Sequence, residues 1–172
     1  HAPVMFEAPL QLTGGGPEIW LATAGGDMWG GAEVWVSTNG DSYTRVGAVS
    51  GKARYGSLTA ALPAGAVFDR ANTLGVEIGA GQLTGGTEQD SRDLLTLCYV
   101  DGEFLAYANA ELKGVGRYTL GNLTRGAYGS AIDSHAAGSK FARIDEALFK
   151  YAVPRNWIGR TVWVKLVSYN VF

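Results

Sequence analysis

Apolar residues alternate with polar or small residues along most of this chain, and this period of two is what most constrains its fold. The pattern is clear in residues 57–62, 74–79, 103–110 and 161–166. Successive side chains of a strand point to opposite faces, so such alternation is typical of strands with one buried face. Roughly ten such segments occur, at the spacing of a sandwich or barrel. The sequence therefore predicts an all-β fold, an antiparallel β-sandwich or barrel-like domain.

The turns support this interpretation. The chain has 25 glycines in 172 residues, about twice the average usage of ~7%, and they are spread as many turns would require. Asn39-Gly40 lies between two strand-like runs and predicts a type I′ hairpin, because both residues tolerate positive φ. Asp101-Gly102 repeats the pattern. Helix is expected only as one or two short turns, chiefly within residues 87–95.

The domain organisation is expected to be simple. Residues 1–17 contain Pro3, Pro9 and Pro17 and are predicted to be an extended lead-in, not the interior of a sheet. Residues 18–172 are predicted to form a single β-rich domain. The start at His1, without an initiator Met, indicates a fragment of a longer chain.

Charge and composition argue against several classes of partner. The net charge is −2, and the 14 Lys and Arg residues are scattered, so no nucleic acid partner is expected. No stretch approaches the ~20 apolar residues of a membrane span, so no membrane insertion is expected. Cys98 lies in an apolar run and is interpreted as a buried, inert thiol.

Motifs for chemistry are incomplete. Gly121 and Gly126 have the spacing of a phosphate loop, but Ala127 stands where its lysine should be. Asp133, Ser134 and His135 are near-consecutive, so they are interpreted as a polar loop with a locally hydrogen-bonded His135 and not as a catalytic triad. With one His and one Cys in separate segments, no metal site and no cofactor are predicted.

Acidic residues could in principle serve a glycan-degrading enzyme. Asp101 and Glu103 flank a hairpin turn, Asp145 and Glu146 are adjacent, and Asp69, Asp90 and Asp93 are expected in loops. Nothing in their spacing places two carboxylates at the roughly 5–10 Å that an acid and base would need. All of them are therefore interpreted as solvated acids near turns, and no catalytic residue is assigned.

Aromatic residues offer a better candidate for binding. Trp29 is expected in a glycine-flanked loop and not in a strand. There it is either a plug over the core or a platform for a sugar ring. Trp20 and Trp35 are expected to serve packing. A glycan site would combine stacking residues with hydrogen-bonding ones, and the candidates are Trp29, Tyr43 and Tyr55 for stacking and Asp27, Asn39 and Asp41 for hydroxyl groups.

Several motifs, taken in order, resemble a known family. The chain from about Glu18 onward is similar to the region after the hub core in phage tail-tip and baseplate hub proteins, which include lambda-like siphophage attachment proteins and the gene transfer agent hub. The motifs are WGGAEVWVSTNGDSY, GSLTAALP, DRANTLGVEI, DGEFLAYANAEL, GRYTLGNLTRGAYGS, SHAAGSKFARIDEALFKY and IGRTVWVKLVSYNVF. The sharpest is formed by Tyr118, Leu120, Leu123, Arg125, Gly126 and Gly129; Ser130 replaces the usual Thr.

The resemblance implies a structural part of the virion without catalytic residues. Its implied partners are other phage tail proteins, with a host cell-surface glycan or receptor as a further partner, and its implied parent assembly is a homotrimer. The implied location is the phage tail tip or baseplate, after synthesis in the host cytoplasm. The leading hypothesis is thus a non-enzymatic module for tail assembly and host attachment. The alternatives are a carbohydrate-binding module and a glycan-degrading enzyme.

The signature motif has a structural interpretation of its own. Tyr118 and Leu120 are expected on the inward face of a strand, with sharp turns at Gly121, Gly126 and Gly129. Arg125 is expected to bond several carbonyls or a carboxylate across that turn.

Overall fold

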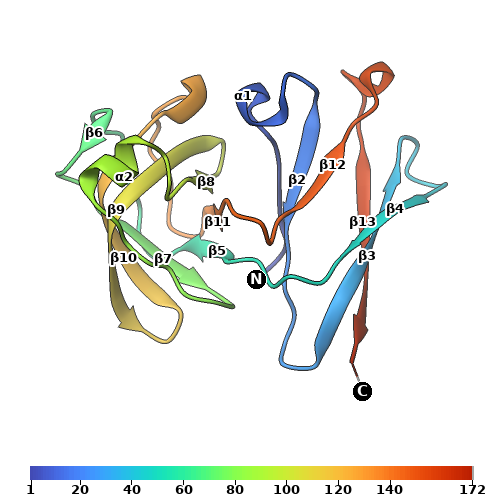
Figure 1. The fold of residues 1–172 in the computed structure, drawn as a ribbon, viewed down its shortest axis with the longest axis horizontal. Coiled ribbons are helices and arrows are strands. Elements are labelled where there is room, and N and C mark those ends of the chain that lie inside the picture. The colour runs from blue at the N-terminus through green and yellow to red at the C-terminus, as the bar shows by residue number, and fades with distance from the viewer. Residues whose placement is uncertain (172) are drawn as a thin grey trace. The chain divides into compact units, whose positions relative to one another are not determined.

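The computed structural model describes residues 1–171 and is built almost entirely of strands (Figure 1). These residues form thirteen strands, two short α-helices and two single 3-10 turns, and helix accounts for 9% of the chain. The predicted all-β fold is confirmed. Phe172, the last residue of the predicted domain, lies outside the described residues. Among those described, no helix combines the length and apolar character needed to cross a membrane.

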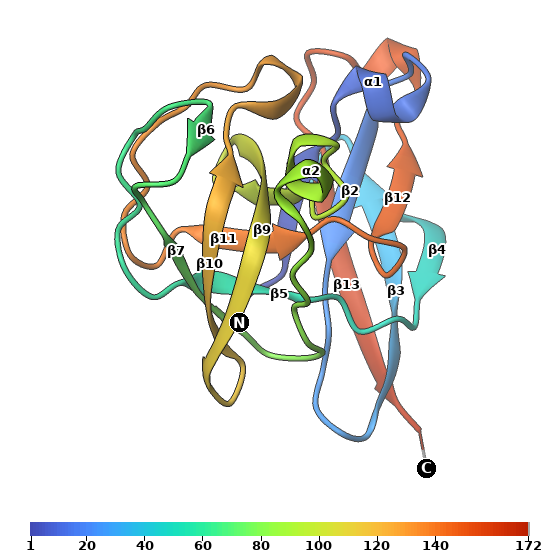
Figure 2. The ribbon, with the colours of Figure 1, turned by 60° about the vertical axis from the view of Figure 1, so that its left-hand side comes forward.

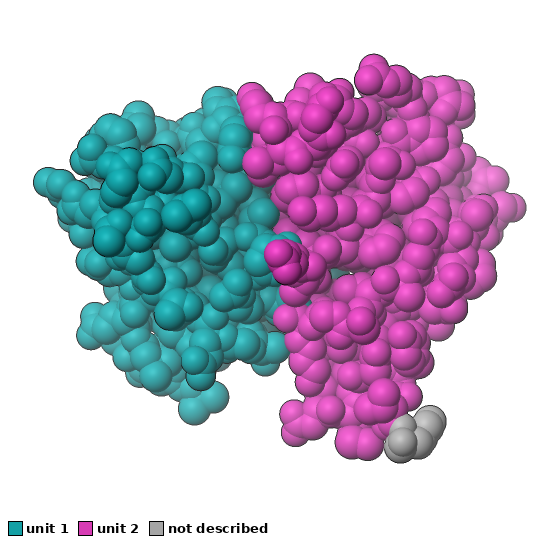
Figure 3. Space-filling model, viewed as in Figure 1, with its two compact units in different colours: residues 1–4, 53–145 teal, residues 5–52, 146–172 magenta. Residues whose placement is uncertain are grey.

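The chain groups into two compact units, which Figure 3 colours separately. The first, here called the barrel unit, comprises residues 1–4 and 53–145. The second, the sandwich unit, comprises residues 5–52 and the described residues from Glu146 onward. Compact units can fold together or separately, so the single domain over residues 18–172 stays a prediction.

The barrel unit is a closed ring of antiparallel strands. In order around the ring these are β5 (Tyr55–Leu58), β7 (Leu74–Ile78), β10 (Arg117–Thr124), β9 (Glu103–Gly114), β8 (Cys98–Val100) and β11 (Lys140–Arg143). The ring closes because β10 pairs with both β7 and β9. Strands β9 and β10 lie side by side in both ribbon views (Figure 1, Figure 2). A two-residue strand, β6 (Phe68–Asp69), adds to β10.

The barrel interior is filled by the apolar side of the alternation. Leu74, Val76 and Ile78 are buried on β7, while the residues between them are partly exposed. Tyr118 and Leu120 on β10 belong to the same core, as predicted. Each such side chain contributes about 1.5–3 kcal/mol when it leaves water, so on β7 the period-two pattern determines which face turns inward. Residues 103–108 of β9 are instead buried on both faces.

A hairpin and a short helix of the barrel unit occur where the sequence predicts them. Asp101 and Gly102 join β8 to β9 with φ of 43° and 102°, the pair of positive values expected for a type I′ turn. Thr87 caps α2 (Glu88–Arg92), and its hydroxyl accepts from the backbone N–H of Asp90 at 3.1 Å. Asp90 in turn accepts from the backbone N–H of Thr87, so this short helix starts at a capping box.

The sandwich unit contains two three-stranded antiparallel sheets. One has the order β1 (Val4–Glu7), β2 (Glu18–Ala22), β12 (Phe149–Ala152), and the other β13 (Trp163–Asn170), β3 (Trp29–Ser37), β4 (Thr44–Val49). Side chains from both sheets share one core, with Leu21 from the first and Val34 from the second. The remaining short elements are α1 (Leu10–Thr13) and η2 (Arg155–Trp157) here and η1 (Ala127–Gly129) in the barrel unit.

The first 17 residues are more ordered than an extended lead-in. They contain β1, at the edge of its sheet, and the single turn α1. Val4 and Phe6 are buried while Met5 and Glu7 are exposed, so a short alternating run between two prolines is sufficient for an edge strand. The prolines restrict where pairing can occur and do not prevent it.

The Asn39-Gly40 turn joins β3 to β4 as a hairpin, but the predicted type I′ turn is wrong. Gly40 has a φ of 79°, whereas Asn39 does not have a positive φ. The Asn39 side chain instead accepts from the backbone N–H groups of Asp41 and Ser42 at 3.0 and 2.9 Å. Because the amide oxygen satisfies these donors, a longer connection replaces the two-residue turn.

Candidate functional site

Arg125 is the centre of a buried polar cluster in the barrel unit, and its side chain has no exposure to solvent. Its guanidinium makes five hydrogen bonds. It reaches Glu103 twice, at 2.6 and 2.8 Å, and Asp69 at 3.4 Å. The other two go to the carbonyl oxygens of Pro63 and Asp133, at 3.0 and 2.9 Å. A guanidinium has five N–H donors, so the predicted role of Arg125, bonding carbonyls and a carboxylate, is confirmed.

Glu103 and His135 were interpreted from sequence as a solvated acid and a locally bonded loop residue, and both interpretations are wrong. The Glu103 side chain is fully buried, and its Oε2 lies 2.7 Å from Nε2 of His135. Burial alone would raise the pKa of Glu103, but hydrogen bonds from Arg125 and His135 outweigh it and hold that pKa below its usual value. Glu103 is therefore the anionic partner of the cluster.

Asp69 joins the cluster from β6, and the interpretation of Asp69 as a solvated loop acid is wrong because its side chain is 2% exposed. Its carboxylate accepts from the backbone N–H groups of Ala71 and Asn72 and from the Asn72 side chain, all within 3.1 Å. Burial opposes ionisation, yet these hydrogen bonds and the nearby Arg125 charge keep the pKa of Asp69 lowered. Asp69 thus fixes the turn after β6 while it neutralises part of the Arg125 charge.

The glycines of the signature motif differ in role. Gly126 and Gly129 have φ of 66° and 76°, as the predicted sharp turns require. The Gly126 N–H also donates to Glu103 at 3.2 Å, and a Cβ on Gly126 would lie 2.8 Å from Cγ1 of Ile132. Gly121 is different: it lies inside β10 with no positive φ, and its neighbour Asn122, with φ 51°, has the left-handed backbone. The predicted turn at Gly121 is wrong because the strand continues through it.

The cluster is closed to ligands. The side chains of Arg125 and Glu103 are 0% exposed, Asp69 is 2% and His135 is 5% exposed. A ligand could reach these groups only if the barrel wall opened. Such an opening would break a buried ion pair, which is costly. The arrangement therefore ties together the ends of β6, β9 and β10 and the loop of His135, and its chemistry is that of a structural ion pair.

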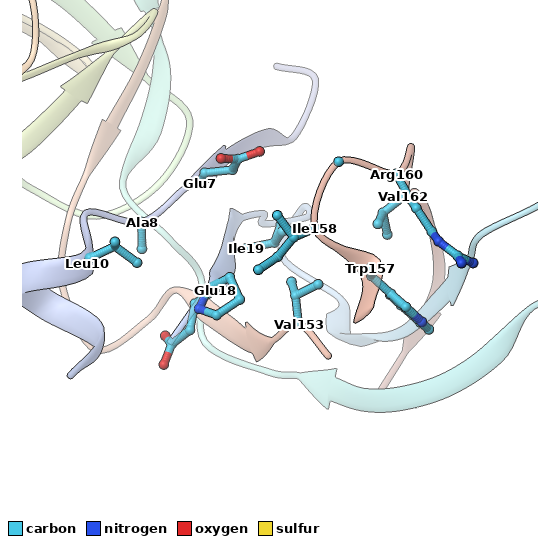
Figure 4. Close-up of a pocket in the computed structure, with 12 residues that line it drawn as sticks. Glu7, Ala8, Leu10, Glu18, Ile19, Val153, Trp157, Ile158, Arg160 and Val162 are labelled. Atoms are coloured by element: carbon cyan, nitrogen blue, oxygen red, sulfur yellow. The ribbon is translucent and has the colours of Figure 1, made fainter. Parts of the chain in front are cut away.

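The sandwich unit contains an open cavity of about 320 Å³. Figure 4 shows Ile19, Val153 and Ile158 grouped in it, with the Arg160 guanidinium turned away. Glu18, on its wall, accepts from the Trp20 indole at 2.6 Å. The volume is at the lower end for small-molecule sites. The cavity is mainly apolar, since its lining residues are Glu7, Ala8, Leu10, Pro17, Glu18, Ile19, Val153, Trp157, Ile158, Gly159, Arg160 and Val162.

The six residues predicted for glycan binding do not form one site. The expected loop position of Trp29 is wrong, because Trp29 is the first residue of β3. It is only 9% exposed and packs in the sandwich core, beside Gly25, so it is a plug. Asp27 is exposed two residues before it. Tyr55 belongs to the barrel unit, where it is buried and its hydroxyl donates to the His1 carbonyl oxygen at 3.2 Å.

The other three candidates, Asn39, Asp41 and Tyr43, lie together on the connection between β3 and β4, at the opposite end of β3 from Trp29. Since a strand rises ~3.3 Å per residue, about 25 Å separates the two ends of β3. Asn39 is committed to its own turn, which leaves Asp41 and Tyr43 available to a ligand.

A second group of aromatic side chains surrounds that connection. The aromatic face, as named here, consists of Trp35, Tyr43, Trp163 and Lys165. Lys165 is the register partner of Trp35, and its Nζ lies 4.5 Å from the Tyr43 ring centroid and 5.5 Å from that of Trp35. Trp163 is 41% exposed and packs over Gly40. Sequence reasoning missed Trp163 and Lys165, although a tryptophan on the wet side of an alternating strand was the available signal.

Together, fold and cluster define an all-β chain with a barrel held by a buried ion-pair network. Comparison with protein families gives a match over residues 53–142 to the family described as Rcc01698-like, C-terminal. The match covers more than half of the chain, and the chain belongs to this family. No curated protein matches the chain. The matched residues are almost those of the barrel unit.

Proposed function

We propose that the chain is a non-enzymatic structural module of a phage-like tail-tip or baseplate protein, with roles in tail assembly and host-surface attachment. The observation that carries this proposal is the closed cluster of Arg125 and Glu103. The motif that most resembles tail proteins contains Arg125, whose ion pair with Glu103 is fully buried, and this supports a structural role for the motif. The family match is consistent with a gene-transfer-agent or phage-like protein.

In this proposal the module acts through its surfaces. Its partners are other tail proteins and the host envelope, the parent protein is a trimer about the tail axis, and the location is the virion. The barrel supplies rigidity, because each of its ring strands is paired on both edges.

The test is deletion of residues 1–172 from the gene that encodes them, with particles then scored separately for tail assembly by electron microscopy and for adsorption to host cells. Loss of either property is expected. Intact particles that adsorb as well as the parent would overturn the proposal. Incubation of the purified chain with host polysaccharide is expected to release no product, and product release abolished by one carboxylate substitution would establish an enzyme instead.

A second candidate function is carbohydrate binding. The observation that favours it is the aromatic face, where indole and phenol rings lie on an exposed surface of the sheet β13-β3-β4. Aromatic rings of this kind are suited to ligands with an apolar face and a polar rim. In this form the function is compatible with the first, since attachment requires a surface ligand.

A further inference from the structure

We propose that the aromatic face binds a polysaccharide bearing carboxylate groups, with Trp163 and Tyr43 as stacking surfaces and Lys165 as the partner of a sugar carboxylate. The inference rests on the attachment role proposed above and names the chemistry of its ligand. Trp29 and Tyr55, the stacking residues expected from the sequence, are buried, whereas Trp163 is exposed and can contact a ligand.

The first step is the charge of the face. Glu33 is the carboxylate on this side of β3, and both of its oxygens are used: Arg45 donates to Oε1 at 2.9 Å and the Trp35 indole donates to Oε2 at 3.2 Å. None of the ion pairs within residues 1–171 involves Lys165. The face therefore presents one uncompensated positive charge, which is complementary to an acidic ligand.

The second step is the setting of that charge. The Lys165 ammonium lies over the rings of both Tyr43 and Trp35, an arrangement that cation–π attraction favours and that restricts the long side chain. A restricted cation loses less conformational entropy on binding than a free one. It is thus prepared to pair with an anion brought to the face.

The third step is the shape of the ligand. The face is an open sheet surface and not a cavity, and Trp163 is 41% exposed on it. An extended chain of sugar rings can stack on such a surface while its hydroxyl groups reach Asp41 on the adjoining turn. A single-stranded nucleic acid also stacks on aromatic rings, but it requires a positive groove along its backbone. The face offers one unpaired lysine and no row of positive charges along which a phosphate backbone could lie, so it favours a glycan that places a single carboxylate at Lys165.

The test is calorimetric titration of the intact chain with oligogalacturonate and with the same oligosaccharide fully methyl-esterified, which keeps the rings and removes the charge. Oligomers of alginate and hyaluronan extend the panel. We expect at least one acidic oligosaccharide to bind, and its affinity to fall on the order of tenfold in Lys165→Met, because a charge-assisted hydrogen bond is lost. Trp163→Ala is expected to weaken binding roughly threefold to tenfold.

Matched controls come from the barrel unit. Lys140→Met removes another exposed lysine and Phe68→Ala another exposed aromatic residue, and neither is expected to change the affinity. A melting temperature is measured for each variant. If Trp163→Ala fails to fold, Lys165→Met still decides the question, since its side chain lies on the outer surface.

Four results would overturn the inference: no acidic oligosaccharide binds better than its neutral counterpart; Lys165→Met binds as the parent does; oligothymidylate binds through the same lysine with equal affinity; or Trp163→Ala dissociates a dimer seen by sedimentation, which would make the face an interface between copies. Failure here is distinguishable from failure of the proposed function. A chain that binds no glycan but whose deletion prevents tail assembly would leave the structural role intact.

Discussion

Arg125 and Glu103 are joined by two hydrogen bonds of 2.6 and 2.8 Å, although 22 residues separate them in the chain and neither side chain reaches solvent. A buried ion pair does not by itself stabilise a fold more than a well-packed apolar pair would. The loss of one partner, however, leaves the other charge buried without compensation, which is strongly destabilising. A large loss of stability is therefore expected when either partner is replaced.

Arg125→Ala is expected to destabilise the chain by about 3–5 kcal/mol, because Glu103 is left charged and buried. The measurement is the free energy of unfolding from denaturant titration. Arg117→Ala on the same strand is the matched control; its side chain is 61% exposed and its ion pair with Glu77 is 3.4 Å long, so little change is expected. A parent-like melting temperature in Arg125→Ala would contradict this role.

Stability is expected to fall in acid. The pKa of Glu103 is held below its ordinary value of 4.5 by Arg125 and His135 against the effect of burial. Stability from a lowered pKa is present above the unfolded-state value and is lost as pH falls through the folded one. The denaturant midpoint should therefore drop below about pH 4.5, with Asp69 adding to the effect. In Glu103→Gln the drop should be shallower, and an identical pH profile would exclude Glu103 as a cause.

The two turn glycines should respond differently to alanine. At Gly129, with φ 76° and open space around it, the cost is the left-handed backbone alone, about 1–2 kcal/mol. At Gly126 the new Cβ would also lie 2.8 Å from Ile132, so Gly126→Ala is expected to cost about 2–3 kcal/mol. Thermal melts of the two variants test the order, and an equal or reversed order would show that Ile132 moves aside without strain.

Cys98 should be unreactive in the folded chain. Burial raises the pKa of its thiol to about 12, and the thiolate is the reactive form. A thiol-specific colorimetric reagent at pH 8 is expected to modify it only after denaturation. Rapid modification of the native chain would mean that the barrel opens locally.

Replacement of Trp29 is expected to reduce stability much more than replacement of Trp163, because Trp29 serves packing and Trp163 is proposed to serve binding. Trp29→Ala removes a core side chain and is expected to cost about 3–5 kcal/mol, whereas Trp163→Ala, on the outer surface, should cost far less. Denaturant titration of both variants measures the difference. Comparable stability losses would place Trp163 in the packing of the sandwich unit.

Local patterns could predict the elements that local chemistry determines. The alternation of Leu74, Val76 and Ile78 indicated a strand with one buried face, and Asp101-Gly102 indicated the hairpin between β8 and β9, because each feature depends only on neighbouring residues. The sequence predicted that Arg125 bonds carbonyls and a carboxylate, but it did not identify which residues supply them. Glu103 could not be identified as that partner, since its burial is a result of the closed barrel and not of the residues around it.

Long-range pairing explains the other misses. Strand β13 pairs with β3 across more than a hundred residues, and β12 with β2 likewise, so no composition shift marked the division into two units. At Asn39 a local pattern was misleading. Its side chain accepts hydrogen bonds from the backbone of its own turn, and these outweigh the preference of Asn-Gly for a type I′ hairpin. The aromatic face could not be predicted for both reasons. It brings Tyr43 of the β3–β4 connection next to Lys165 of β13, which is distant in the chain.

The nested order of the two units has a consequence for synthesis on the ribosome. All strand partners in the barrel ring lie between Tyr55 and Arg143, so this ring can close once those residues have left the exit tunnel. The sheets of the sandwich unit lack β12 and β13 until the last part is translated. Strands β2 and β3 must wait unpaired on that side while the barrel forms, and nascent chains are most exposed to aggregation in this interval.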